Sequence, residues 1–147
     1  MQHTRITFLA VAALLVAMVG VRAGTAANDE PALGGYCPVA YSAMGKAMKG
    51  KAEFSSQYEG RTYHFANAEA KQMFAQAPER YLPAWDGLCT TALAEGKKLA
   101  GDPKIFAVRN GRTYLFSSAK AKTMFEKDPE AIVAQAETHW KEMRSAH

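Results

Sequence analysis

The stretch GRTYHFANAEAKQMFAQAPE, at residues 60–79, decides how this chain is interpreted, because a close copy of it follows. Residues 111–130 read GRTYLFSSAKAKTMFEKDPE, and the identical residues recur at a constant offset of 51. The offset is 52 further upstream, where Cys37 in the first copy matches Cys89 in the second. A fixed period of this kind indicates two copies of one structural unit. The two cysteines of the protein therefore hold equivalent places in the two copies.

Each copy predicts a β-hairpin followed by an amphipathic helix. The four strand segments are rich in aromatic residues: 52–58 and 61–65 in the first copy, 105–109 and 112–116 in the second. Asn110-Gly111 between the last two is a type I′ turn signal. Asn67 and Ser118 then stand where they can cap the helices that follow, whose apolar residues recur at i, i+3 and i+4.

The fold class that follows is α+β, with two pseudo-symmetric hairpin-plus-helix units that share one core. A unit of about 50 residues buries too little surface to be stable alone, so the copies must share their core. We expect the units at 35–84 and 87–143 of a single domain, 35–147, after a flexible lead-in at 28–34. The second copy continues as a longer C-terminal helix that can cover the core. The aromatic residues predicted to line this core are Tyr63, Phe65, Phe74, Tyr114, Phe116 and Phe125.

The N-terminal residues 1–27 have the layout of a secretory signal peptide. Arg5 is followed by an apolar run from Ile6 to Val21 and then by small residues. The run has 16 residues, which is short of the roughly 20 that span a bilayer. We therefore predict a periplasmic or secreted protein that meets the membrane only through this peptide.

The charge of the remaining chain excludes an electrostatic nucleic-acid binder. The formal net charge is +4, and it falls to +2 when Arg5 and Arg22 leave with the leader. The lysines are scattered along the chain and form no basic cluster. Expected partners are a metal ion or another protein.

The residues at the start of the first copy and in its middle resemble the YHS-domain family. The segment 35–41 reads GYCPVAY, residues 63–65 read YHF, and residues 87–89 read GLC. The resemblance covers residues 35–83 well and residues 87–140 more loosely. It implies a small α+β unit related to metal-binding cysteine modules and found near heavy-metal and copper handling.

The same resemblance implies three cysteine ligands in the metal-binding members. Their positions correspond here to Ala40, Ala66 and Ala70, and in the second copy to Ala92, Ser117 and Ala121. An alanine methyl has no lone pair to offer a metal. The resemblance therefore supports the fold more strongly than it supports metal binding.

The cysteine pair leaves three interpretations open. Cys37 and Cys89 form a disulfide in an oxidising compartment, hold a soft ion such as Cu(I) between two thiolates, or stay unpaired. Each precedes a predicted helix start, which favours the thiolate. His64 and Met44, with Met48, are the candidate helpers for a metal, although a strand histidine and core methionines explain them as well.

No motif for a nucleophile with its base, for catalytic zinc or for phosphate binding is present in the sequence, so an enzyme is not predicted. Three functions stay open at this point: a metal-related binding protein, a thiol–disulfide redox protein that uses Cys37 and Cys89, and a structural or partner-binding module with a static disulfide.

Overall fold

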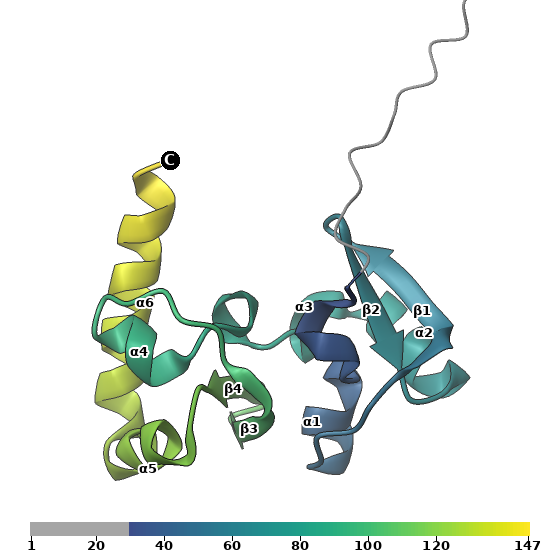
Figure 1. Cartoon of the computed structure of the whole chain (residues 1–147), viewed down its shortest axis with the longest axis horizontal. Helices are drawn as coiled ribbons and strands as arrows, with labels where there is room; N and C mark the ends of the chain where they lie inside the picture. The colour runs from purple at the N-terminus through teal and green to yellow at the C-terminus, as the bar shows by residue number, and fades with distance from the viewer. Residues whose placement is uncertain (1–29) are drawn as a thin grey trace, which may run out of the picture.

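The computed structural model describes residues 30–147, so the predicted signal peptide lies outside the described residues. The fold is α+β, as the sequence predicted, with two separate antiparallel hairpins (Figure 1). The first unit consists of η1 (Ala32–Gly35), α1 (Pro38–Met44), β1 (Lys51–Tyr58), β2 (Arg61–Phe65), α2 (Ala68–Gln76) and α3 (Pro78–Tyr81). The second unit consists of η2 (Ala84–Gly87), α4 (Thr90–Ala94), β3 (Asp102–Arg109), β4 (Arg112–Phe116), α5 (Ala119–Lys127) and α6 (Pro129–Ser145).

The turns and caps have the local geometry that the sequence predicted. Asn110 and Gly111 both have positive φ, at 51° and 74°, as a type I′ turn requires. Glu59 and Gly60 do the same at the first hairpin, at 49° and 74°. The side chains of Asn67 and Ser118 accept hydrogen bonds from the backbone N–H groups of Ala70 and Ala121, which caps α2 and α5.

A close backbone crossing explains one pair of matching glycines. The N–H of Gly50 donates to the carbonyl of Gly35 at 2.8 Å, and that of Gly101 donates to Gly87 at 2.9 Å. A Cβ at Gly50 would clash with the backbone carbonyl group of His64, which no side chain tolerates. In each unit, the segment that follows the first helix crosses close to the hairpin of the same unit at this glycine.

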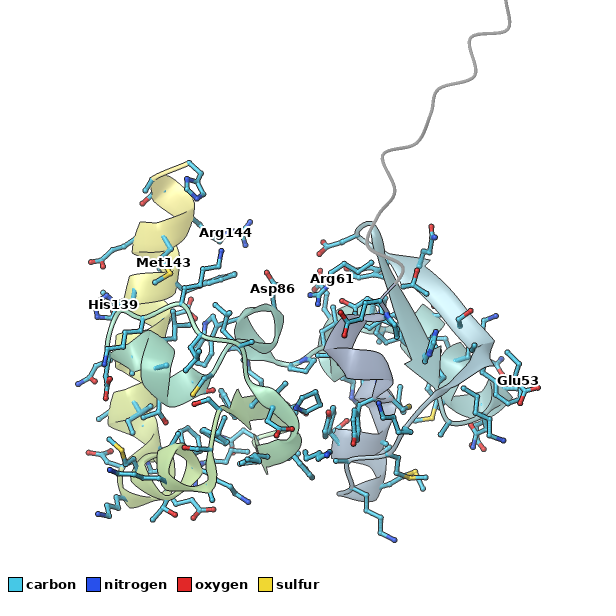
Figure 2. All side chains as sticks on the ribbon, in the orientation of Figure 1. Glu53, Arg61, Asp86, His139, Met143 and Arg144 are labelled. Atoms are coloured by element: carbon cyan, nitrogen blue, oxygen red, sulfur yellow. The ribbon has the colours of Figure 1, made fainter. Side chains whose placement is uncertain are left out.

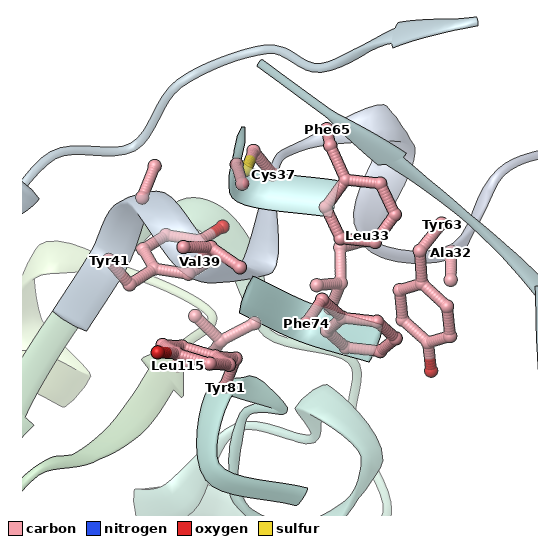
Figure 3. Packing of buried hydrophobic residues seen from close by; sticks show 12 residues of the cluster. Ala32, Leu33, Cys37, Val39, Tyr41, Tyr63, Phe65, Phe74, Tyr81 and Leu115 are labelled. Carbon is pink, nitrogen blue, oxygen red and sulfur yellow. The ribbon is translucent and has the colours of Figure 1, made fainter. Parts of the chain in front are cut away.

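The prediction of one shared core is wrong, because the buried residues form two clusters that meet at the second hairpin. Tyr63, Phe65 and Phe74 lie in the first cluster (Figure 3), and their counterparts Tyr114, Phe116 and Phe125 lie in the second. The aromatic triad of each unit packs internally. The ring centroids of Phe65 and Phe74 are 5.0 Å apart, as are those of Phe116 and Phe125.

The two units are joined by the outer face of the second hairpin, which packs against α1 of the first unit (Figure 1). Leu115 of β4 belongs to the first cluster although both of its neighbours belong to the second. The Phe106 ring lies 4.9 Å from the ring of Tyr41, whose hydroxyl donates to the carbonyl of Pro103 at 2.7 Å. Burial raises the pKa of Tyr41 above its usual value, so the phenol stays protonated and remains a donor at neutral pH.

The equivalent face of the first hairpin is polar. His64 pairs with Ser55 across that hairpin, whereas Leu115 pairs with Phe106 across the second. His64 is partly buried, whereas Leu115 is only 1% exposed. The contact between the units therefore joins unlike surfaces head to tail, because only the second hairpin has two apolar faces.

The C-terminal helix covers the corresponding surface of the second unit. α4 packs against α6 in the place where α1 packs against a hairpin. Ala136 of α6 is buried in the second cluster, with Trp140 and Met143 packed around it. The predicted covering helix is confirmed, although it covers the second cluster and not a shared one.

Two smaller differences from the sequence prediction lie at the edges of the units. Ala32 and Leu33 of η1 are buried in the first cluster, so part of the segment predicted as a flexible lead-in is packed. Met124 has the spacing of a core residue in α5, yet its side chain is 39% exposed, because Phe125 is the residue of this helix that is buried in the second cluster. Within residues 30–147, no helix is both long and apolar enough to span a bilayer.

The matched positions Leu115 and His64 test the head-to-tail joint. Leu115→Ala should lower the free energy of unfolding by about 2–5 kcal/mol, because it opens a cavity between the units. His64→Ala removes the equivalent side chain from a polar face and should cost about 0.5 kcal/mol or less. Urea denaturation of both variants measures the difference. Equal losses would contradict the assignment of Leu115 to the joint.

Candidate functional site

The cysteines predicted to form a pair lie in different clusters. Cys37 is the N-cap residue of α1 in the first cluster (Figure 3), and Cys89 is the N-cap residue of α4 in the second. Both are fully buried and both are free, so the predicted disulfide is not formed in this structure. The physical reason is the head-to-tail joint, which packs each helix start inside its own unit and brings no two equivalent surfaces together.

Cys89 has a polar neighbour that Cys37 lacks. The hydroxyl of Ser117 donates a hydrogen bond to the sulfur of Cys89 at 3.3 Å. The counterpart of Ser117 in the first unit is Ala66, which has no such group. Ser117 stands at one of the positions where the family resemblance implies a cysteine ligand, and the Cys89 sulfur lies beside it.

The donors in either unit do not fit a resident metal ion. In the first unit Ala40 is 1% exposed and Ala70 is 8% exposed, so methyl groups occupy two of the three ligand positions in a packed core. Each unit then offers one thiol, joined in the second unit by one hydroxyl. Among residues 30–147, no three His, Cys, Asp or Glu side chains are grouped so that they could hold an ion. Tetrahedral sites for soft metals need more ligands than this.

The predicted helper residues do not converge on either cysteine. Met44 is 52% exposed at the last position of α1, while Cys37 precedes its first. Seven residues of helix separate their Cα atoms by about 10 Å. His64 lies instead near Gly35, where an added Cβ would be 3.7 Å from its Nδ1. Met48 is partly buried against the first cluster, as a packing residue is expected to be.

A different group of residues forms a polar and aromatic site that sequence reasoning missed. The guanidinium carbon of Arg112 lies 5.1 Å from the ring centre of Trp85 and 5.9 Å from that of Tyr114. The indole N–H of Trp85 donates to the Oε2 of Glu137 in α6 at 3.1 Å. Trp85 is 4% exposed and has a positive φ of 51°, a conformation that bulky residues rarely adopt.

Beside Arg112 lies a pocket of about 390 Å³ between the β3–β4 turn and α6, here called the Arg112 pocket. Tyr114, Pro129, Val133 and Ala134 form its apolar floor. Arg109, Asn110, Arg112, Glu130 and Glu137 form its polar rim. The sequence signal for this pocket was the extension of the final helix beyond the repeat. That extension predicted a cover for the core, but it also supplies one wall of the pocket.

Charged groups also face each other where the two units meet. Figure 2 shows Arg61 of the first unit and Asp86 of the second on the facing sides of the two halves. Both influence the phenol of Tyr63. Burial raises the pKa of Tyr63, the Arg61 charge lowers it, and the Asp86 charge raises it. The two charges therefore act in opposite directions on one buried aromatic residue.

The comparison with protein families agrees with the motifs of the first unit. The sequence model of the YHS domain matches residues 39–85, which is 47 of the 147 residues. This stretch of the chain is a YHS domain. The match points to a metal-associated domain family. No curated protein and no solved structure matches the chain.

The YHS match begins within α1 and ends at Trp85 in η2. It therefore spans the first unit, while the second unit lies almost wholly outside it. The second unit nevertheless repeats the order of elements, the turn geometry and the bulged strand pairing of the YHS domain. The Arg112 pocket lies in this second unit.

The burial of both cysteines makes their chemical state directly measurable. A thiol reagent such as dithiobis(nitrobenzoate) should find no reactive thiol in the folded protein, because both sulfurs are shielded from solvent. It should find both thiols after unfolding in guanidinium chloride without reductant. No thiol in the unfolded protein would show that a disulfide forms after all.

Proposed function

We propose that this chain is an exported binding module built on a YHS domain, and that it acts through a ligand or protein partner at its surface. The donor set in the two cores carries this proposal. Alanines occupy the ligand positions of the first unit, and each unit has a single buried thiol. A packed core with one sulfur supports the fold without providing a metal site.

We also infer that the second unit is a divergent copy of the YHS unit. Support comes from the 51-residue offset and from the shared crossing of Gly50 and Gly101. In this account the first copy keeps the family's sequence, while the second has acquired an apolar outer hairpin face and a long final helix. Divergence of this kind is how repeated units obtain terminal caps.

Soft-metal binding is the second candidate, and one observation favours it. The Cys89 sulfur lies 3.3 Å from Ser117, at a position where metal-binding relatives supply a ligand. A Cu(I) ion at Cys89 would still require a second soft donor from outside the unit. The redox alternative is weaker, since the two thiols lie in separate clusters.

Copper analysis separates the two candidates. Reduced protein exposed to Cu(I) and then desalted should retain far less than one ion per chain, because neither core offers two thiolates. A variant with Ala40→Cys, Ala66→Cys and Ala70→Cys restores the family's ligand positions and serves as the positive control. Retention of about one ion per chain by the natural sequence, lost in Cys89→Ser, would favour metal binding instead.

Export is proposed from the first 27 residues alone, and it has its own test. Intact-mass measurement of protein produced in a bacterial host with a periplasm should place the first residue between Gly24 and Asp29. A mass that still includes residues 1–23 would indicate that the apolar run stays as an anchor.

A further inference from the structure

We propose that the Arg112 pocket binds a small carboxylic acid with an apolar body, with the guanidinium of Arg112 receiving the carboxylate. The proposal rests on the proposed function, since it specifies the ligand class of a surface-binding module. The volume of about 390 Å³ falls in the range of ordinary small-molecule pockets, roughly 300–1,000 Å³.

Among the described charged groups around the pocket, Arg112 is the cation that has no salt-bridge partner. Arg109 and Glu130 pair with each other at 3.2 Å. Glu137 accepts the indole N–H of Trp85 with one oxygen and lies 3.6 Å from the Lys141 ammonium with the other. Arg112 has no salt bridge to any carboxylate among residues 30–147. The rim therefore presents one guanidinium with its charge uncompensated.

The guanidinium of Arg112 already lies near two aromatic rings before any ligand arrives. It stacks over Trp85 and Tyr114, both of which are buried. Trp85 is held in turn by Glu137 of α6. A planar guanidinium held on aromatic faces loses little freedom on binding, and its edge can still donate two parallel hydrogen bonds to a carboxylate.

The floor of the pocket selects the rest of the ligand. Tyr114, Pro129 and Val133 offer rings and branched carbons with no polar group except the tyrosine hydroxyl. An aromatic or aliphatic body can lie on this floor while its carboxylate reaches Arg112. A charge-free ligand would use the floor but would leave the guanidinium without a partner.

The first unit does not build this pocket. Its final helix α3 ends at Tyr81, the counterpart of Ile132, so nothing corresponds to Val133, Ala134 and Glu137. Leu33 also replaces Trp85, so Arg61 stacks only on Tyr63, at 5.9 Å. Arg61 stands at the same place in the hairpin as Arg112 but lines a different hollow, of about 510 Å³, that has no α-helix wall and no tryptophan. It is therefore a control for a hairpin arginine without the α6 wall.

A second hollow borders Arg112, and its two carboxylates form no salt bridge with the Arg112 guanidinium. On its other side Arg112 lines a smaller hollow of about 200 Å³ with Glu79, Asp86 and Arg144. Figure 2 shows Arg144 on α6 and Asp86 on η2 at this edge of the second unit. The Arg144 guanidinium stacks on Trp140 at 5.7 Å, so the hollow adds a second aromatic-backed cation.

The test uses amide chemical shifts of the whole ¹⁵N-labelled protein and two probes of the same shape. Phenylacetate should shift the amides around Arg112, Val133 and Glu137, and 2-phenylethanol, which lacks the charge, should bind about tenfold more weakly. Arg112→Gln should remove this preference for the acid, whereas Arg61→Gln should leave it intact.

A second arm distinguishes a free acid from a peptide terminus. A Gly-Gly-Phe peptide and its C-terminal amide present the same side chain with and without the carboxylate. We expect phenylacetate to bind at least as well as the peptide, because the Arg109–Glu130 pair occupies part of the rim that a longer ligand would have to cross. Stronger binding of the peptide acid would overturn the small-molecule assignment.

Equal binding of acid and alcohol, unchanged binding in Arg112→Gln, or shifts confined to the first unit would overturn the proposal. Val133→Ala, which trims the floor and leaves the guanidinium in place, should weaken both probes together. These outcomes are independent of the copper measurement, so failure of the carboxylate site and failure of the proposed function can be told apart.

Discussion

The burial of Leu115 and Phe106 against the first unit is the contact on which the rest of the structure depends. Neither unit of about 50 residues buries enough surface to be stable by itself. The second hairpin solves this by having two apolar faces, one for its own cluster and one for the cluster next to it. The hydroxyl of Tyr41 adds a directed bond to Pro103 across the same joint.

This joint also determines where the chemistry of the molecule is found. Because unlike surfaces meet, the two helix starts that carry Cys37 and Cys89 remain inside their own units. Alanines fill the ligand positions around the first of them, and the cores pack as hydrocarbon with isolated thiols. The polar and aromatic groups that could hold a ligand lie instead on the surface of the second unit, between the β3–β4 turn and α6.

The Arg112 pocket is a consequence of how the second copy ends. α6 packs on α4 and covers a face of the second unit that would otherwise be exposed. The same helix passes the hairpin turn and supplies one wall of the pocket. A structural need of the last unit thus produced a surface feature that the first unit lacks.

The sequence by itself determined the local structure and the family of the first unit. The periodic aromatics, the Asn110-Gly111 turn and the caps at Asn67 and Ser118 are set by interactions within a few residues, which a sequence pattern records directly. The replacement of His64 by Leu115 was also visible in the sequence. The consequence of this replacement was not visible, because the pattern of a single strand does not say which surface the outer face of its hairpin will contact.

Only the tertiary structure decided how the copies meet, and therefore that there are two clusters and no cysteine pair. A repeat offset fixes which residues are equivalent, but it is compatible with a two-fold joint and with a head-to-tail joint alike. The choice depends on the match between Phe106 and Leu115 and the surface around Tyr41. The stacking of Arg112 on Trp85 likewise joins residues 27 positions apart, whose contact is set by packing and not by local pattern.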